Sequence, residues 1–348
     1  MKILHVLLSR LPLPPTKYGG TERVVWSLAQ GQILQGHDVR FLWKKASPLP
    51  KDTIIYNKKI PLTQQIGDWP DVVHFHWPYE GELHKPFVCT EHGNANHARS
   101  YPINTVFLSK KHAENHGAKC YIYNGLDWRS YGEPNLTQPK NYFHFLGKAK
   151  TATKNLAGAI DIAKRAKTRL DVLGGSRFNF TRSPIAYWDL SVKFHGMVGG
   201  QKKINTIKNS NGLIAPSLWH EPFGLAITES LYLGCPVFAT PFGSHPEIID
   251  SDEIGLLSTS YEELAEGIKD VSRFSRMLCH QTAKEKFGMG LMAENYLKTY
   301  EKVINNETLN PAIPRADKSY ITLLSLEDKS YITLLSLEDK EIDRTTCD

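Results

Sequence analysis

Residues 2–43, KILHVLLSRLPLPPTKYGGTERVVWSLAQGQILQGHDVRFLW, contain the order of segments that decides the fold. The apolar run 2–8 predicts a buried strand, and a loop rich in Pro and Gly follows it. Residues 21–36 carry apolar side chains at helical spacing and end at Gly36, and residues 37–43 predict a second strand. A strand, a helix and a strand in this order form the unit of a parallel sheet.

The same alternation continues outward from this unit in two series. Short apolar runs predict further strands of the first series at 71–77, 85–92, 104–109 and 118–124. The second series begins near Tyr142, with a helix at 154–167 and strands at 141–147, 170–175, 191–196, 211–217 and 235–240. Between them, the polar stretch 133–140, EPNLTQPK, predicts a domain junction. Two such series predict an α/β protein of two doubly wound, Rossmann-like domains with a ligand cleft at the carboxyl ends of the strands.

Size and composition are compatible with this architecture. The 348 residues suit two domains, and 41% hydrophobic with 22% charged residues is typical of a globular protein. The first apolar run is too short for a signal peptide, and Arg10 with a proline-rich stretch follows it. Five scattered cysteines without a C-x-x-C pair oppose a disulfide framework and a zinc site. We therefore expect a cytoplasmic protein.

The charge of the chain is unevenly distributed. The net charge is +6, yet the segment from Asp317 onward holds eight acidic and four basic residues, so residues 1–316 carry +10. A basic body suits an anionic partner, such as a nucleotide diphosphate, phospholipid head groups or nucleic acid. The total by itself is equally compatible with charge that only maintains solubility.

Residues 221–229, EPFGLAITE, carry the strongest chemical signal in the chain. The predicted strand 211–217 precedes them, and their Gly-containing loop leads into a helix that carries Glu229. Backbone N–H groups at a helix start bind anions, while carboxylates accept hydrogen bonds from paired hydroxyl groups. A diphosphate between Glu221 and Glu229 would have one carboxylate near a sugar and the other near a ribose.

This motif resembles the E-x7-E motif of retaining glycosyltransferases with the GT-B fold, in particular glycosyltransferase family 4 (glycosyltransferase group 1). Five other segments are similar to that family in the same order along the chain: PPTKYGGTERVVWSLA, TEHGN, YNGLD, FLGKAKTATKN and PFGSHPEII. The similarity extends to about residue 305. It implies a GT-B fold with an acceptor domain at 1–138, a nucleotide-sugar domain at 139–288 and a helix at 289–310 that crosses back to the first domain.

The resemblance also assigns roles to residues. Glu221 would hold hydroxyls of the donor sugar, and His92 would lie at the reacting face. Glu229 would bind the ribose, and Gly19 with Gly20 would allow the first loop to approach the phosphates. The other donor-binding residues it implies are Lys148 and Lys154 at the diphosphate and the backbone N–H groups of Phe223, Gly224 and Leu225. The family commonly has arginine at the position of Lys148, and lysine lacks the two-pronged contact of arginine.

Several other residues have alternative interpretations. His74 and His76 alternate in a predicted strand, so one could face the cleft, although core histidines explain both. Asp250-Ser251-Asp252 matches the D-x-D string of metal-dependent glycosyltransferases, but its position after PEII opposes that role, and we expect no metal. A basic helical surface formed by Lys110, Lys111, His112, His116 and Lys119 either contacts acidic lipid or is simply solvated.

The tail contains an exact tandem duplication. DKSYITLLSLE occupies 317–327 and again 328–338, and two copies are too few for a solenoid. The alternation in SYITLLSL predicts a strand or an amphipathic segment. A flexible tail and a segment that mediates self-association or docking are the two alternatives.

Taken with the resemblance, these features imply a metal-independent glycosyltransferase. It would move a hexose or a related sugar from a nucleotide-diphosphate sugar to a glycan or lipid-linked acceptor, with retention of configuration, in polysaccharide or lipopolysaccharide synthesis. The location would be cytoplasmic, with peripheral contact to an acidic membrane, and nucleic acid is not an expected partner. The alternatives are a nucleotide-sugar-binding protein without turnover and a GT-B-like epimerase. An NAD-dependent oxidoreductase is opposed by the lack of G-x-G-x-x-G after the first strand and of an acid at the end of the second, where Trp43 and Lys44 stand.

Overall fold

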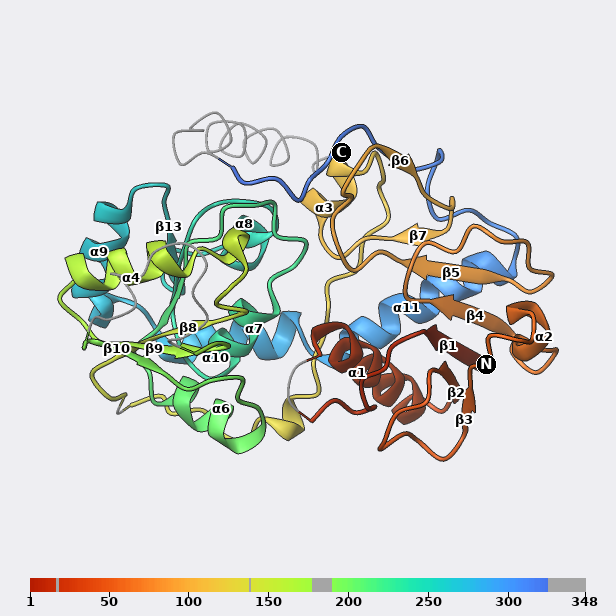
Figure 1. The fold of residues 1–348 in the computed structure, drawn as a ribbon, viewed down its shortest axis with the longest axis horizontal. Coiled ribbons are helices and arrows are strands. Elements are labelled where there is room, and N and C mark those ends of the chain that lie inside the picture. The colour runs from red at the N-terminus through yellow and green to blue at the C-terminus, as the bar shows by residue number, and fades with distance from the viewer. Residues whose placement is uncertain (17–18, 138, 177–189, 325–348) are drawn as a thin grey trace, which may run out of the picture.

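A computed structural model of the chain describes residues 1–16, 19–137, 139–176 and 190–324. It contains two six-stranded parallel sheets that lie side by side, each covered by helices, as Figure 1 shows. The predicted α/β class with two Rossmann-like halves is therefore confirmed. Within the described residues, none of the helices combines the length and the apolar character needed to cross a membrane.

The first sheet is built around the strand of residues 2–7. Its order is β3-β2-β1-β4-β5-β7, and β1 pairs in parallel with both β2 and β4. Its strands are short, and all except the edge strand β3 have at least half of their residues buried: β1 (Lys2–Leu7), β2 (Asp38–Trp43), β3 (Thr53–Ile55), β4 (Val72–Phe75), β5 (Phe87–Thr90) and β7 (Thr105–Val106). The helices of this half are α1 (Gly20–Leu34), α2 (Leu62–Ile66) and α3 (Lys110–Asn115).

The second sheet repeats this plan with the order β10-β9-β8-β11-β12-β13. Its strands are β8 (Phe143–Leu146), β9 (Leu170–Leu173), β10 (Val192–Phe194), β11 (Leu213–Ala215), β12 (Val237–Ala239) and β13 (Gly255–Leu257). Its helices are α4 (Leu156–Arg165), α6 (Gly200–Lys208), α7 (Leu225–Tyr232), α8 (His245–Ile248), α9 (Tyr261–Lys269) and α10 (Arg276–Lys286). The strand order places β8 and β11 beside each other at the centre of the sheet. From this point the chain adds strands first on one side and then on the other, and ligands of doubly wound sheets bind at such a switch point.

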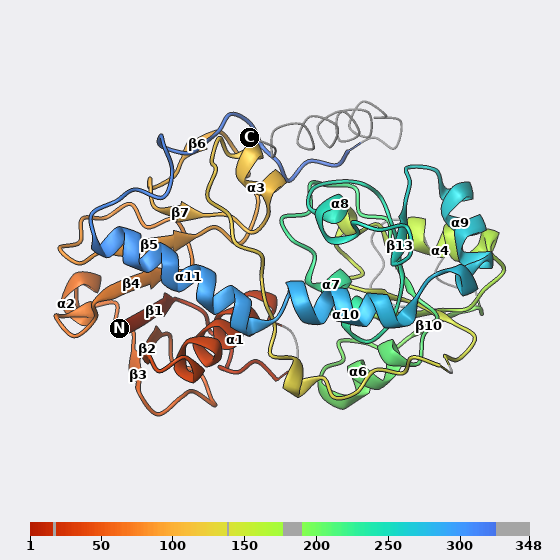
Figure 2. The same ribbon diagram turned by 180° about the vertical axis from the view of Figure 1, so that it is seen from behind.

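Two connections join the halves. One is the segment after β7, which passes through the 3-10 turn η1 (Trp128–Ser130), and the other is the step from α10 to α11 (Met289–Ile304). They meet where Leu126 N donates to Phe287 O at 3.0 Å and Met289 N donates to Leu126 O at 3.0 Å. Figure 2 shows α10 on the second half and α11 lying across the first half.

Helix α11 completes the core of the first half. Met292, Tyr296 and Tyr300 pack in one cluster with Val24 and Leu28 of α1. The two helices approach closely at a glycine, because a Cβ on Gly31 would lie 2.7 Å from Met289 O. The structure thus places the C-terminal helix on the N-terminal half.

The strand predicted at 118–124 in the first half is wrong. Residues 118–124 form only an isolated bridge, Phe107 to Tyr121, because the side chain of Asn310 accepts from the N–H groups of Lys119 and Cys120 at 3.0 and 2.9 Å. A strand neighbour would otherwise have used those groups.

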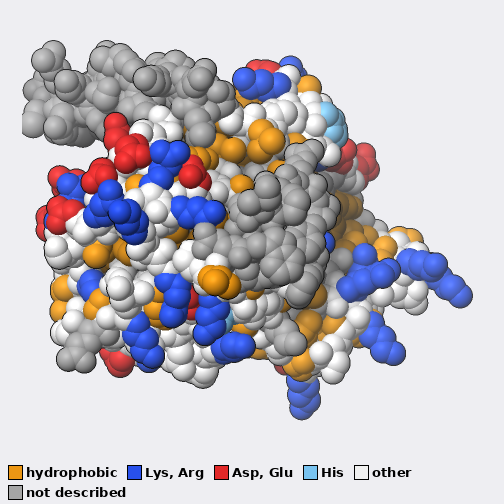
Figure 3. All heavy atoms as spheres, turned by 60° about the vertical axis from the view of Figure 1, so that its left-hand side comes forward, with side chains coloured by type: hydrophobic (Ala, Val, Ile, Leu, Met, Phe, Trp, Pro, Cys, Tyr) orange, Lys and Arg blue, Asp and Glu red, His pale blue; other side chains and the backbone are white. Residues whose placement is uncertain are grey.

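The predicted basic helical surface is also wrong for two of its five residues, His112 and His116. On α3, His112 and His116 are buried, and His112 Nε2 donates to Gly93 O at 2.8 Å. Lys110 and Lys111 form ion pairs with Glu114 of the same helix. Figure 3 shows one face of the molecule, on which Lys and Arg side chains are spread among acidic, apolar and uncharged ones.

Of the tail repeat, the first copy is described as far as Leu324, and the second copy lies outside the described residues. The predicted strand is not found in 317–324. The neighbouring Arg315–Ala316 (β14) pairs antiparallel with Arg99–Ser100 (β6). Leu324 N donates to Leu218 O at 2.9 Å and Tyr320 N to Ala95 O at 2.8 Å, so this segment touches both halves of the protein.

The buried histidine of β8 makes stability dependent on pH. His144 is fully buried between Ser210 Oγ at 2.8 Å and Ser230 Oγ at 2.9 Å, and burial, with a contribution from Arg276, lowers its pKa to about 3. An unfolded histidine titrates near pKa ~6.5, so below that pH the unfolded state binds a proton that the folded state does not. We expect the free energy of unfolding to fall as the pH drops from about 6.5 towards 4, by up to about 1.4 kcal/mol for each unit of pKa difference.

Urea unfolding at a series of pH values measures this dependence. His144→Asn should make the pH dependence less steep, whereas the same change at the exposed His97 should leave it as in the wild type. Equal slopes for His144→Asn and the wild type would contradict the assignment of this proton uptake to His144.

Candidate functional site

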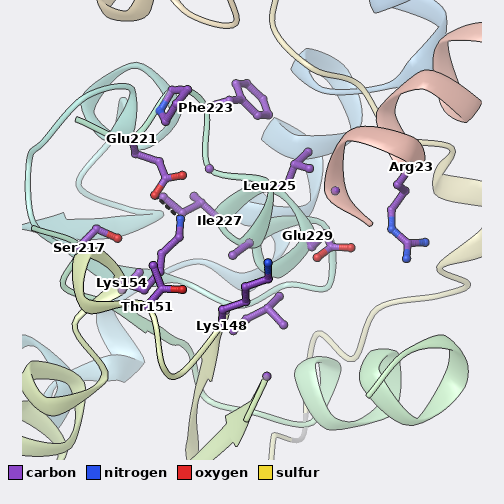
Figure 4. A pocket seen from close by; sticks show the side chains of 18 of the residues that line it. Arg23, Lys148, Thr151, Lys154, Ser217, Glu221, Phe223, Leu225, Ile227 and Glu229 are labelled. Carbon is purple, nitrogen blue, oxygen red and sulfur yellow. Dashed lines mark hydrogen bonds and ion pairs between the residues drawn. The ribbon is translucent and has the colours of Figure 1, made fainter. Parts of the chain in front are cut away.

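The residues predicted as a site come together in one cavity between the two halves. The cavity has a volume of about 810 Å³. The predicted site residues that line it are Gly19, Gly20, His92, Lys148, Lys154, Glu221, Phe223, Gly224, Leu225 and Glu229. It lies at the carboxyl ends of β8 and β11, as expected for a doubly wound sheet. Figure 4 shows the central part of this cavity.

Glu221 is held by two donors from the second half. Lys154 Nζ lies 2.5 Å from Glu221 Oε2, and Trp219 Nε1 donates to the same oxygen at 2.9 Å. Burial would raise the pKa of Glu221, but the charges of Lys154 and of the nearby His245 outweigh it, and the pKa lies below its usual value. Glu221 is therefore an ionised carboxylate paired directly with Lys154, as the dashed line in Figure 4 shows.

The loop around Glu221 has a conformation that depends on glycine. Gly224 has φ +94°, in the left-handed region that glycine adopts without strain, and α7 begins at the next residue. Gly243 has φ +71°, and a Cβ there would lie 2.2 Å from Glu221 N. Ser244 N donates to Glu221 O at 2.9 Å. The PFGSHPEII segment thus clamps the loop that carries Glu221. The residues at the start of α7, where the first N–H groups of a helix lack intrahelical partners, line the cavity.

Glu229 is in the second turn of α7 and is almost fully buried. Its Oε1 pairs with Lys203 Nζ from α6 and accepts a hydrogen bond from Tyr131 OH. Burial by itself would raise the pKa of Glu229, but the charges of Lys203 and Arg23 outweigh this effect. The pKa lies below its usual value, so Glu229 is also ionised. In Figure 4 it lies on the side of α7 that faces Arg23 of α1.

The two glycines of the first loop differ in why they are needed. Gly19 has φ +140°, and a Cβ there would lie 2.9 Å from Glu22 Oε2 and 3.0 Å from Pro15 Cβ. Gly20 begins α1, and a Cβ there would meet only Leu225 Cδ1 at 3.4 Å. At position 19 the backbone conformation and the neighbouring side chains require glycine. At position 20 the protein leaves room for a larger side chain, and that room is part of the cavity.

Lys148 and Lys154 lie on the loop between β8 and α4. Lys148 follows the end of β8, and Lys154 ends the 3-10 turn η2 (Ala152–Lys154). The loop is fixed to the neighbouring strand, since Ala149 N donates to Gly174 O at 3.0 Å and a Cβ on Gly174 would lie 1.9 Å from Gly147 O. Both cations therefore project into the cavity from a tightly held loop.

His92 follows β5 and is the only predicted catalytic residue on the first half. Its Nε2 lies 3.0 Å from His76 Nδ1, and burial lowers the pKa of His92 to about 4. His74 and His76 are both buried, as their interpretation as core residues predicts. His76 nevertheless contacts His92. The alternating pattern of residues in the predicted strand could not indicate this contact.

The sequence alone missed several residues of the cavity. They are Arg23, Lys203, Trp219 and His245, which contact or electrostatically influence the two glutamates, and Ile321 of the tail. Tyr131, which donates to Glu229 from outside the cavity lining, was missed as well. Arg23 had a usable signal, because it stands in the first turn of a helix that follows two glycines. Lys203 had none, because a lysine on an amphipathic helix is normally solvated.

Asp250 and Asp252 do not line this cavity. Asp250 forms an ion pair with Lys286 of α10. The D-x-D string therefore lies outside the candidate site.

Comparison with known proteins gives a family for the second half. The family described as glycosyl transferases group 1 matches residues 129–289, which include the second sheet, Lys148, Lys154 and both glutamates. O-antigen chain mannosyltransferase C of Escherichia coli is 24% identical over 313 residues, covering 73% of this chain and 83% of that protein. A probable sucrose-phosphate synthase of Thermosipho melanesiensis is 31% identical over 113 residues. This second match covers 30% of the chain and only 27% of that protein.

Solved structures share the whole architecture at low identity. AviGT4, a glycosyltransferase involved in avilamycin A biosynthesis, superimposes with a TM-score of 0.72 at 19% identity over 88% of this chain and 99% of its own. Anabaena Alr3699/HepE in complex with UDP and glucose gives a TM-score of 0.61 at 17% identity, covering 86% and 99% of the two chains. The fold is the GT-B fold of these proteins, and residues 129–289 match the family of glycosyl transferases group 1.

Proposed function

We propose that the protein is a retaining, metal-independent glycosyltransferase that uses a nucleotide-diphosphate sugar. The observation that carries the proposal is the pair of ionised, buried carboxylates, Glu221 and Glu229, on either side of the start of α7 in a cavity that also holds Arg23, Lys148 and Lys154. Carboxylates suit sugar and ribose hydroxyls, and cations with helix N–H groups suit a diphosphate between them.

The proposed reaction breaks the bond between the anomeric carbon and the diphosphate oxygen, whose electron pair stays on the diphosphate. The acceptor hydroxyl oxygen forms the new bond to the anomeric carbon, and its proton passes to a phosphate oxygen on the same face. Lys148, Lys154 and the start of α7 stabilise the charge that develops on the leaving group. Glu221 holds the hydroxyls of the transferred sugar, and attack on the face that the diphosphate leaves retains the configuration.

Relatives support a role in surface glycan synthesis. One is an O-antigen mannosyltransferase, and WaaG, a glycosyltransferase involved in lipopolysaccharide biosynthesis, shares the fold with a TM-score of 0.59. We infer that the acceptor is a glycan or a lipid-linked glycan, and that the protein acts in the cytoplasm with peripheral contact to an acidic membrane. Exposed Lys and Arg side chains such as those on the face in Figure 3 would make that contact.

The proposal predicts that a nucleotide diphosphate binds without a metal. A ligand that binds only the folded protein at 100 times its Kd adds about 2.7 kcal/mol to stability. This increment corresponds to a rise in Tm of several degrees for a protein of this size. UDP, GDP, ADP and their sugar conjugates, each tested in EDTA, should therefore separate into one series that raises Tm and others that do not.

Two controls make this screen decisive. Glu229→Ala should abolish the shift, because it removes the proposed ribose contact, whereas Glu262→Ala on the surface of α9 should retain it. Anomeric NMR of the product then tests retention. A shift that requires added divalent metal would refute metal independence, and binding without transfer to any acceptor would favour the binding-protein alternative.

A further inference from the structure

A row of buried polar side chains leads from helix α1 through the first sheet to His92. His5 of β1 has Nε2 at 2.8 Å from Gln32 Oε1 and Nδ1 at 3.0 Å from His76 Nε2. His76 Nδ1 in turn lies 3.0 Å from His92 Nε2. Gln32 and His5 are completely buried and His76 is nearly so, while His92 lines the cavity.

Each contact in this row fixes the direction of the next. Gln32 Oε1 can only accept, so His5 Nε2 carries the proton and His5 Nδ1 is left to accept. His76 must then donate from Nε2 and accept at Nδ1, and His92 must donate from Nε2. The remaining nitrogen of His92, Nδ1, is therefore without a proton and is a hydrogen-bond acceptor. Turning the amide of Gln32 over would reverse every donor and place an N–H at Nδ1 instead.

A second row of contacts joins the nitrogen of the same amide to helix α11. Gln32 Nε2 donates to Tyr300 OH of α11 at 3.1 Å, and Tyr300 OH lies 2.7 Å from His74 Nδ1. His74 Nε2 lies 2.7 Å from Thr90 Oγ1. Since Tyr300 OH receives the amide proton, it gives its own proton to His74. The helix that crosses back from the second half thus anchors the residue at the start of the row.

These histidines are neutral, as the argument requires. Burial lowers the pKa of His5 and of His92 to about 4, and burial with the neighbouring histidines lowers the pKa of His76 well below its usual value. His5, His74 and His76 also present ring nitrogens within 4.8 Å of one another, as a metal site would. Both nitrogens of each ring, however, already have hydrogen-bond partners. Hydrogen bonding accounts for the cluster without an ion.

We propose that Gln32 is a positioning residue whose amide orientation sets the tautomer of His92, so that Nδ1 faces the cavity as a hydrogen-bond acceptor. A hydroxyl group of the sugar donor or of the acceptor is the partner that such a nitrogen selects. This consequence for transfer rests on the proposed function. The tautomer of His92 follows from the hydrogen-bond row and does not rest on it.

Selective ¹⁵N labelling of histidine measures the tautomer directly, because protonated and bare ring nitrogens have well-separated shifts. The His92 signals are identified by their loss in His92→Asn. We expect wild-type His92 to carry its proton on Nε2. Gln32→Met should produce a mixture of tautomers, and Gln32→Glu, whose carboxylate still accepts from His5, should restore the wild-type state.

A matched control and a second variant complete the test. Gln35→Met removes another amide of the α1 segment, one that donates to Gly290 O at 3.1 Å, and should not change the His92 signals. Tyr300→Phe releases the amide with a smaller change of volume and should also give mixed tautomers. A proton on Nδ1 in the wild type, or His92 signals that are the same in Gln32→Met, Tyr300→Phe and the wild type, would overturn the proposal.

Kinetics separate this inference from the proposed function. Gln32→Met should lower kcat about tenfold, the equivalent of about 1.4 kcal/mol, while Gln32→Glu recovers most of it. A changed tautomer with unchanged kcat would support the row of hydrogen bonds and remove His92 from the transfer step. Loss of kcat without any change of tautomer would overturn the positioning role.

Discussion

Glu221→Ala is expected to lower the rate of sugar transfer by about 100- to 1000-fold, the range observed when a group that stabilises a transition state is removed. Two effects combine in this variant. The hydroxyls of the transferred sugar lose their acceptor, and Lys154 loses the carboxylate that holds its Nζ at 2.5 Å. The lysine is then no longer positioned for the diphosphate.

The fold should persist in this variant. The Lys154 side chain is 29% exposed, so its charge can be hydrated when the partner is removed. Trp219 is the other donor to Glu221 and lies at the wall of the same cavity. We expect a change in Tm of only a few degrees, measured by circular dichroism, together with the loss of transfer measured by release of nucleotide diphosphate.

Glu221→Gln and Glu262→Ala serve as controls. The glutamine keeps the size of the side chain and one acceptor but loses the charge that orders Lys154, so its rate should lie between the wild type and the alanine variant. Glu262 forms only a surface pair with Arg165, and its removal should leave the rate unchanged. Turnover by Glu221→Ala within about threefold of the wild type would refute the role of Glu221.

The sequence predicted the framework of this site better than its contacts. Strand and helix periodicity placed β1, α1, β2, β8 and α4 within a few residues, because each is a local pattern of burial. The same reasoning failed at 118–124, where the backbone pairs with the side chain of Asn310, almost two hundred residues away. A pairing at that separation leaves no periodic signal.

The same limit applies to the polar residues of the site. His112 and His116, outside the site, are an exception, because they share a face with the buried Ala113 and this spacing could have suggested their burial. Lys203 and Tyr131 meet Glu229 only because α6 and the inter-domain segment fold onto α7. Gln32 likewise lies among helical residues with ordinary spacing, and its link to His92 depends on three strands and on α11 meeting in space. Such partners follow from tertiary packing and not from local sequence.

Lys203→Met is expected to destabilise the protein by about 3 kcal/mol or more, because it leaves the charge of Glu229 buried without its main partner. The side chains of Lys203 and Glu229 are only 10% and 8% exposed, so water in the cavity that they line replaces only part of the lost contact. Tyr131 and Arg23 compensate for part of the charge, and urea unfolding measures the remainder. Lys202→Met, the same substitution at an exposed neighbour on α6, is the control and should be nearly neutral.

The double variant Lys203→Met with Glu229→Leu separates stability from binding. Replacing both members of a buried ion pair by apolar residues is often neutral or stabilising, so the double variant should recover most of the stability that Lys203→Met loses. It should nevertheless fail to bind the nucleotide, because the proposed ribose acceptor is gone. Recovery of both properties would show that Glu229 is a structural partner of Lys203 and does not hold the ribose. Recovery of stability alone would assign this buried carboxylate to the donor, with Lys203 keeping it charged until the nucleotide arrives.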